Sequence, residues 1–186
     1  MKMGKMIKPF NIWLTGLSGS GKTTLAEKIN EYLISLNISN EVLDGDVYRA
    51  ILSPEAGYTQ NERDAFRRKI IFVAKLLNKH EVSCIFSLLS SSKKIRGYAR
   101  EELNNFIEVY VKCPIEVCVQ RDPKGLYKKA KAGKESNIVG IHIPYEEPEN
   151  PDIIVETHRQ GIESCVAAIL NKIEKLGFIQ SLTVEA

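Results

Sequence analysis

The stretch Gly16-Leu17-Ser18-Gly19-Ser20-Gly21-Lys22-Thr23 decides how this chain folds. It has the spacing G-x-x-x-x-G-K-[ST], follows the apolar run Ile12-Trp13-Leu14 and precedes a helical pattern that opens at Thr24. A strand, a glycine-rich turn and a helix in this order form a P-loop, in which backbone N–H groups and the positive end of the helix dipole face a polyphosphate. The sequence therefore predicts a nucleoside triphosphate as ligand.

The donor site is expected to lie in the P-loop and in the first turn of the helix after it. Lys22 is placed to reach the β- and γ-phosphates of ATP as a mobile charge, and the Thr23 hydroxyl is the expected protein ligand of Mg²⁺. The residues predicted to hold the donor in this region are Gly16, Ser18, Gly19, Ser20, Gly21, Lys22, Thr23 and Thr24.

The length of 186 residues corresponds to one domain, so residues 1–186 are expected to form a single unit with its own core. The end segments 1–9 and 179–186 are predicted to be frayed. The four cysteines form no C-x-x-C pair, which favours free thiols in a reducing compartment. Because the sequence has neither the apolar core of a signal peptide nor a run long enough to cross a bilayer, we expect a cytoplasmic protein without membrane contact.

Short apolar runs alternate with helical patterns along the chain. Apolar residues spaced by three and four predict helices over about residues 25–36, 66–77 and 162–176. Alternation of this kind predicts a mostly parallel sheet with helices on both faces, which is an α/β fold in three layers. The five predicted strands are Asn11–Thr15, Glu41–Leu43, Val82–Leu88, Ile107–Val111 and Ile153–Val155.

Polar clusters follow three of the predicted strands, at residues 16–23, 44–46 and 90–92. Ligands of parallel sheets collect beyond the carboxyl ends of the strands, so we expect these clusters to share one cleft. Asp44 and Asp46 flank Gly45, and phosphoryl transfer to an alcohol needs a carboxylate that accepts the hydroxyl proton. Asp46 is therefore predicted to be the base.

Basic and aromatic residues after the second strand indicate an anionic acceptor with a base to stack. The guanidinium groups of Arg49 and Arg63 match phosphate or sulfate oxygens, and Tyr58 is placed in a loop where it can stack on a base. Arg67 and Arg68 are interpreted as solvated helix charges.

The segment Arg121–Lys134 holds six basic residues and one acidic residue, with a Pro and a Gly that break helices. One short cationic segment in a nearly neutral chain favours a compact polyanion over a nucleic acid polymer. The composition predicts a basic lid over about residues 121–142, whose closure would exclude water and suppress hydrolysis of the triphosphate.

The sequence resembles the adenylylsulfate (APS) kinases, which use ATP to phosphorylate the ribose 3′-hydroxyl of adenosine 5′-phosphosulfate. The likeness runs from about Ile12 to Thr157, and the family implies a P-loop kinase fold, Mg·ATP as donor, a lid and a homodimer. The stretches that carry it are WLTGLSGSGKTTLA (13–26), LDGDVYR (43–49), GYT (57–59), FIEVYV (106–111), RDPKGLYKKA (121–130) and PYEEPENP (144–151).

The resemblance also implies roles for individual residues. Asp46 matches the family's catalytic aspartate, and Ser90 falls where the family has a serine described as a phosphoryl carrier. Because direct transfer needs no protein nucleophile, we expect Ser90 to hydrogen-bond near the phosphates instead. Arg121 is assigned to the donor, and Thr23 and Asp44 to the metal. The predicted acceptor residues are Asp44, Arg49, Tyr58, Arg63, Phe66, Lys124, Leu126 and Ile138.

The departures from the family pattern concern the acceptor side. Phe66 stands where the family usually has an asparagine, Ser91-Ser92-Lys93 replaces Pro-Tyr-Arg, and Ile138 replaces a phenylalanine that would form one face of an aromatic sandwich around the acceptor base. Stacking of a base on an aromatic side chain contributes about 1–3 kcal/mol in nucleic-acid sites. The sequence thus predicts conserved donor chemistry and an altered acceptor site.

Three hypotheses follow. The first is an ATP-dependent kinase of APS, which gives 3′-phosphoadenosine 5′-phosphosulfate (PAPS) and ADP. The second keeps the chemistry but changes the acceptor to another nucleotide-linked anion such as cytidine diphosphoramidate. The third is a non-catalytic nucleotide switch, which the sequence disfavours because Asn78-Lys79-His80-Glu81 carries Glu where the switch motif N-K-x-D needs Asp.

Overall fold

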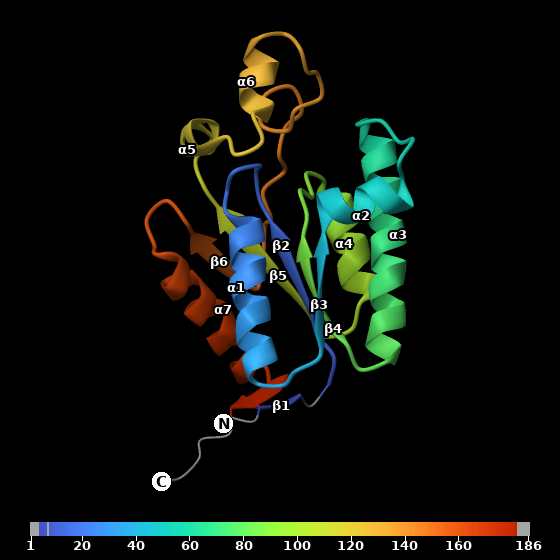
Figure 1. The fold of residues 1–186 in the computed structure, drawn as a ribbon, viewed down its shortest axis with the longest axis vertical. Helices are drawn as coiled ribbons and strands as arrows, with labels where there is room; N and C mark the ends of the chain where they lie inside the picture. Colours follow the sequence, from blue (N-terminus) through green and yellow to red (C-terminus); the bar gives the residue numbers. More distant parts are fainter. Residues whose placement is uncertain (1–3, 7, 182–186) are drawn as a thin grey trace.

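The computed structural model describes residues 4–6 and 8–181 and places a five-stranded parallel sheet at the centre of the chain (Figure 1). The order β3-β4-β2-β5-β6 puts the strand that feeds the P-loop in the middle. The strands are β2 (Asn11–Thr15), β3 (Asn40–Asp44), β4 (Ser83–Ser87), β5 (Phe106–Lys112) and β6 (Ile153–Glu156). The predicted fold class is therefore confirmed, with strand bounds within two residues of the sequence prediction.

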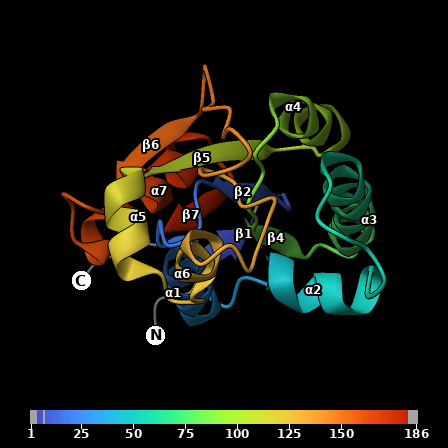
Figure 2. The same ribbon diagram turned by 90° about the horizontal axis from the view of Figure 1, so that it is seen from above.

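Helices cover both faces of the sheet (Figure 2). The helices are α1 (Lys22–Ser35), α2 (Gly45–Leu52), α3 (Gln60–Lys79), α4 (Lys93–Glu102), α5 (Ile115–Arg121), α6 (Leu126–Lys131) and α7 (Ile162–Lys175). Along β2, Ile12 and Leu14 pack with α1 and α7, whereas Trp13 packs with α3 and α4. Successive side chains of a strand point to opposite faces, so one short strand supplies both apolar layers.

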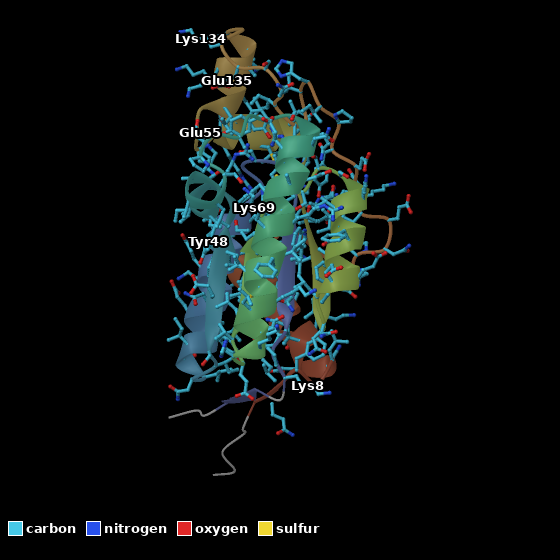
Figure 3. All side chains as sticks on the ribbon, turned by 90° about the vertical axis from the view of Figure 1, so that its right-hand side faces the viewer. Lys8, Tyr48, Glu55, Lys69, Lys134 and Glu135 are labelled. Atoms are coloured by element: carbon cyan, nitrogen blue, oxygen red, sulfur yellow. The ribbon has the colours of Figure 1, made fainter. Side chains whose placement is uncertain are left out.

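The helix α3 begins at a capping box. The Thr59 hydroxyl accepts a hydrogen bond from the Glu62 amide, and the Glu62 carboxylate accepts one from the Thr59 amide. This pairing satisfies N–H groups that the first turn leaves free. Lys69, which is labelled in Figure 3, donates from Nζ to the Leu52 carbonyl at 2.7 Å and so ties α3 to the end of α2.

The prediction of frayed ends is wrong for part of both termini. β1 (Gly4–Met6) pairs with β7 (Ile179–Ser181) in a separate antiparallel ladder. Ile179 is buried in the core, and Phe178 stacks on Phe10 with ring centroids 6.2 Å apart. Apolar burial therefore orders this end of the chain. The rest of the predicted frayed residues at the extreme ends, 1–3, 7 and 182–186, lie outside the described residues.

All four cysteines are buried and free, as predicted. Among the described residues, no helix combines the length and the apolar character needed to span a bilayer.

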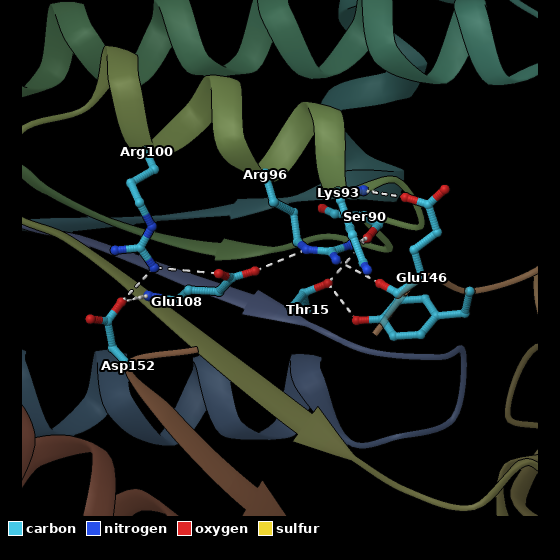
Figure 4. Close-up of polar contacts among 9 residues, drawn as sticks. Thr15, Ser90, Lys93, Arg96, Arg100, Glu108, Glu146 and Asp152 are labelled. Atoms are coloured by element: carbon cyan, nitrogen blue, oxygen red, sulfur yellow. Dashed lines mark hydrogen bonds and ion pairs between the residues drawn. The ribbon is translucent and has the colours of Figure 1, made fainter. Parts of the chain in front are cut away.

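A charged network joins α4 to β5 and to the segment before β6 (Figure 4). Nε of buried Arg96 lies 2.9 Å from Oε1 of Glu108, which is also buried, and Arg100 contacts both Glu108 and Asp152. Arg96 also donates to the carbonyls of Ser90 and Glu146, each at 2.6 Å. The network holds the loop at Ser90 against the segment that contains Glu146.

We expect Glu108→Gln to lower the free energy of unfolding by about 3–5 kcal/mol, because it leaves the buried Arg96 charge without its counter-ion. Denaturant unfolding measures the change. The matched control is Glu102→Gln, which breaks the surface pair Lys75–Glu102 (2.6 Å) and is expected to cost about 0.2–1 kcal/mol. Equal losses in the two variants would contradict the assignment of Glu108 as the structural counter-ion.

Candidate active site

Part of the P-loop lies so close to neighbouring backbone that there is no room for a side chain at Gly19. A Cβ at Gly19 would lie 2.9 Å from the Cys118 carbonyl oxygen, and the φ of Gly19 is +78°. Gly21 has a φ of +96° and forms the N-cap of α1. Only glycine adopts such angles readily, so the loop can turn into the helix with its N–H groups available to an anion.

Lys22 is folded back over the loop. Its Nζ donates to the Leu17 carbonyl at 2.7 Å and contacts Ser20 Oγ at 3.4 Å. Burial removes water from the ammonium group and lowers the pKa of Lys22 to about 8. Both hydrogen-bond partners of the buried Lys22 ammonium group are neutral, so phosphate oxygens can replace them.

Hydroxyl and carboxylate oxygens gather where β3 and β4 end. Thr23 Oγ1 lies 3.4 Å from Asp44 Oδ2 and 3.1 Å from Ser87 Oγ. Such hard oxygen donors suit Mg²⁺, which keeps several waters and takes its other ligands from substrate phosphates. Sequence reasoning missed Ser87, although its place at the end of β4 was a usable signal.

Asp44 and Asp46 have different environments. Asp44 caps α2, because its Oδ1 accepts from the Asp46 and Val47 amides at 2.9 and 3.4 Å. Asp46 is exposed on the first turn of α2, where its Oδ2 pairs with Lys124 Nζ. The Lys124 contact brings the predicted lid segment to the carboxylate predicted to be the base.

The beginning of the lid segment is attached to the P-loop. Arg121, the last residue of α5, donates to the Gly19 carbonyl at 3.3 Å and to the Thr157 hydroxyl and carbonyl at 3.1 and 2.9 Å. Tyr127 OH donates to the Ser18 carbonyl at 3.0 Å. Sequence reasoning did not identify Thr157 and Tyr127. α6 and the loop after it project beyond the carboxyl ends of the strands (Figure 1).

The two arginines predicted to bind the acceptor lie close to the Tyr58 ring. Arg49 and Arg63 have their guanidinium carbons 4.5 and 5.1 Å from the centroid of the Tyr58 ring. Arg63 donates from Nε to the Tyr58 carbonyl at 2.9 Å and from Nη2 to Asn137 at 2.8 Å, so α3 meets the far end of the lid segment there. Tyr58 is 55% exposed.

Three other predicted acceptor residues occupy different places. Phe66 is buried in the core between α3 and the sheet, although its ring lies 5.8 Å from the Arg49 guanidinium. Ile138 packs against the small apolar cluster that includes Tyr127. Leu126 is half-buried at the start of α6.

The structure corrects the interpretation of Arg67, and Ser90 is found in a buried position. Arg67, predicted to be a solvated charge, is only 4% exposed, because it lies on the inward face of α3. That prediction is wrong, whereas Arg68 is exposed as predicted. Ser90 is 0% exposed, and its Oγ has no hydrogen-bond partner in the described part of the chain. Its carbonyl accepts from Thr15 and Arg96, so Ser90 contributes a fixed backbone here rather than an accessible hydroxyl.

Known proteins are similar to this chain in sequence and in fold. Residues 8–156 match the family described as adenylylsulphate kinase. A probable adenylyl-sulfate kinase of Pyrococcus abyssi is 44% identical over 170 residues, which cover 91% of this chain and 98% of the relative.

Solved structures agree with this assignment. The APS kinase CysC of Mycobacterium tuberculosis, in complex with AMPPNP and APS, superposes with a TM-score of 0.86 at 33% identity over 90% of this chain and 98% of that one. A hexameric APS kinase from Thiobacillus denitrificans has a TM-score of 0.71 at 27% identity and covers 94% of this chain, which spans 30% of that protein. The P-loop, the paired aspartates and the extent of these matches together assign the chain to the adenylylsulphate kinase family.

Proposed function

We propose that this chain transfers the γ-phosphoryl group of ATP to the ribose 3′-hydroxyl of adenosine 5′-phosphosulfate, which yields PAPS and ADP. One observation carries the proposal. The phosphate-facing residues Lys22 and Thr23 lie at the same edge of the sheet as Asp46, with Thr23 linked to Asp44. A donor and an acceptor hydroxyl can therefore meet between the P-loop and α2.

The proposed mechanism assigns each residue one task. The loop amides and Lys22 stabilise charge on the transferring phosphoryl group, and Asp46 accepts the proton of the attacking hydroxyl. Arg121 holds the donor side, and Arg49 and Arg63 hold the anionic group of the acceptor. Thr23, with help from Asp44, would hold Mg²⁺, which would supply positive charge beside the phosphates.

The proposal also covers the closure of the lid, the oligomeric state of the protein and its cellular compartment. Closure of the basic lid over residues 121–142 would exclude water from the triphosphate, and the Lys124–Asp46 pair supports such a movement. The family resemblance favours a homodimer, although one structural relative is described as hexameric. Free buried thiols favour the cytoplasm.

The residues expected to stack on the acceptor base are the reason to test a second acceptor. Tyr58 is an exposed aromatic residue, while Phe66 is buried and position 138 holds isoleucine instead of a second ring. A smaller base such as cytosine needs less stacking surface, so cytidine diphosphoramidate is the alternative acceptor.

Coupled detection of ADP release, with APS and cytidine diphosphoramidate offered side by side, separates the two acceptors. Turnover of APS with the larger kcat/KM supports the first proposal. Failure to turn over APS at high enzyme, together with turnover of the cytidine compound, would replace it.

ATP affinity is expected to fall as the pH rises above about 8. The lowered pKa of Lys22 means that the free enzyme loses this ammonium charge through about pH 8, whereas bound phosphate favours the charged form. Calorimetric titration of Mg·AMPPNP from about pH 6.5 to 9 measures the effect, and the decline should be absent in Lys22→Met. A flat wild-type profile would show that the charge of Lys22 does not contribute to binding.

Arg63→Ala is expected to raise the KM for the acceptor by about 10-fold or more and to leave the KM for ATP within about 2-fold. A charge-assisted hydrogen bond contributes about 1.5–3 kcal/mol, and Arg63 lies on the acceptor side. Initial rates with each substrate varied in turn measure both constants. Equal increases would mean that the division into donor and acceptor sides is wrong.

A further inference from the structure

The carboxylate of Glu62 binds the turn before α3 at two points. Its Oε1 accepts from the Gly57 amide at 2.8 Å, and its Oε2 accepts from the Thr59 amide at 3.0 Å and from the Thr59 hydroxyl at 2.6 Å. Hydrogen bonds from Thr59 and then from Gly57 hold the pKa of Glu62 below its ordinary value, so the side chain is ionised at neutral pH. A capping box uses only the bond to the Thr59 amide, so the bond to Gly57 calls for a separate explanation.

One peptide group links Glu62 to Arg49. The Gly57 amide that donates to Glu62 is in the same peptide group as the Ala56 carbonyl, which accepts from Arg49 Nη2 at 3.1 Å. Arg49 also donates to the Gly57 carbonyl. Position 57 leaves room for the carboxylate, because a Cβ there would lie 2.9 Å from Glu62 Oε2. The carboxylate and the guanidinium thus bind opposite ends of one peptide dipole.

A second peptide group links Glu62 to Arg63. The Thr59 amide that donates to Glu62 is in the same peptide group as the Tyr58 carbonyl, which accepts from Arg63 Nε at 2.9 Å. Hydrogen bonds in a chain polarise one another, so an anion at the amide end makes the carbonyl a better acceptor for a cation. Each arginine is therefore held by a carbonyl that the charge of Glu62 polarises.

We propose that Glu62 is a positioning residue for the acceptor, which fixes the guanidinium groups of Arg49 and Arg63 through these two peptide groups. The inference rests on the proposed function and deepens it, because the task of the two arginines there is to hold the anionic group of the acceptor. Guanidinium groups with fixed directions lose less conformational freedom when they bind an anion. The effect concerns the acceptor and not ATP, since both arginines belong to the acceptor side of the site.

Glu62→Gln tests this role, because glutamine at this position also completes a capping box and keeps the start of α3. Its one carbonyl oxygen then accepts from the Thr59 amide, and its NH₂ group cannot accept from Gly57, so the link to Arg49 is lost. Initial rates are measured with APS and ATP varied in turn. We expect the KM for APS to rise about 5-fold or more, with the KM for ATP within about 2-fold and the thermal midpoint nearly unchanged.

Two further variants separate positioning from charge and from capping. Glu55→Gln removes an exposed carboxylate from the segment between α2 and α3 (Figure 3) and should change neither KM. Thr59→Ala removes the capping hydroxyl but keeps both amides, so we expect a lower thermal midpoint and a KM for APS within about 2-fold of the wild-type value. Equal effects of Thr59→Ala and Glu62→Gln on the KM for APS would refute the proposal, because Glu62 would then only cap α3.

A double-mutant cycle shows whether Glu62 acts through Arg49. In the Arg49→Ala background, Glu62→Gln should raise the KM for APS by less than about 2-fold, because the guanidinium that it positions is already absent. Additive effects of the two substitutions would overturn the proposal.

The outcomes also separate this inference from the proposed function. Wild-type turnover of APS together with an unchanged KM for APS in Glu62→Gln would overturn the role of Glu62 alone. If the wild type uses cytidine diphosphoramidate instead of APS, the same measurements are made with that acceptor and the same contrast is expected. A wild type that turns over neither acceptor would overturn both proposals.

Discussion

Asp46→Asn is expected to reduce kcat by about 10²–10⁴-fold, because the amide cannot accept the proton of the attacking hydroxyl. Asp46 is exposed at the start of α2, so the substitution is not expected to disturb the core. Single-turnover measurement with saturating ATP and acceptor checks the result, since it reports the chemical step separately from product release.

Asp44→Asn provides the comparison for Asp46. Asparagine also caps helices well, so α2 should persist, but the Mg²⁺ side of the site loses a charge. We expect Asp44→Asn to shift the Mg²⁺ concentration needed for half-maximal rate, whereas Asp46→Asn should lower the rate at every concentration. Near-normal turnover in Asp46→Asn would assign the base to another group.

Lys22→Met is expected to lower kcat by about 10²–10³-fold and to weaken ATP binding. Methionine fills much of the same space, but it cannot stabilise the charge that develops on the transferring phosphoryl group. Initial rates and AMPPNP titration measure the two effects. A modest loss of rate would indicate that the loop amides alone carry the stabilisation.

Lys28→Met is the matched control for Lys22→Met. Lys28 lies on the same helix, has a side chain that is 42% exposed and pairs with Glu31 at 2.7 Å. Surface pairs of this type contribute about 0.2–1 kcal/mol, so this variant should keep normal activity and stability. An equal loss of activity in both variants would point to damage to α1 rather than to a missing phosphate ligand.

The sequence located the sheet and the P-loop well because both depend on local patterns. The strand predicted at Asn11–Thr15 has the same bounds in the structure, and the P-loop follows it as expected. The helices α2 and α4 were not predicted. α2 has 8 residues and α4 has 10, so each is too short for apolar spacing to repeat over several turns, and α2 buries no residue.

Arg67 shows why residue type alone misleads. Its charge favoured a solvated position, yet its spacing of four from Arg63 and from Ile71 places it on the buried face of α3. The periodicity contained the signal, but only packing against the loop after β4 showed that the side chain is enclosed.

The sequence by itself determined the phosphate-binding turn, the alternation of strands and helices, and the shared edge where Thr23, Asp44 and Asp46 meet. Spacing between near neighbours specifies these features. The tertiary structure alone decided the pairs Arg96–Glu108, Arg63–Asn137 and Lys124–Asp46, and the burial of Arg67 and Ser90. Partners 74 and 78 residues apart meet only because helices pack against particular faces of the sheet, and sequence spacing does not encode that geometry.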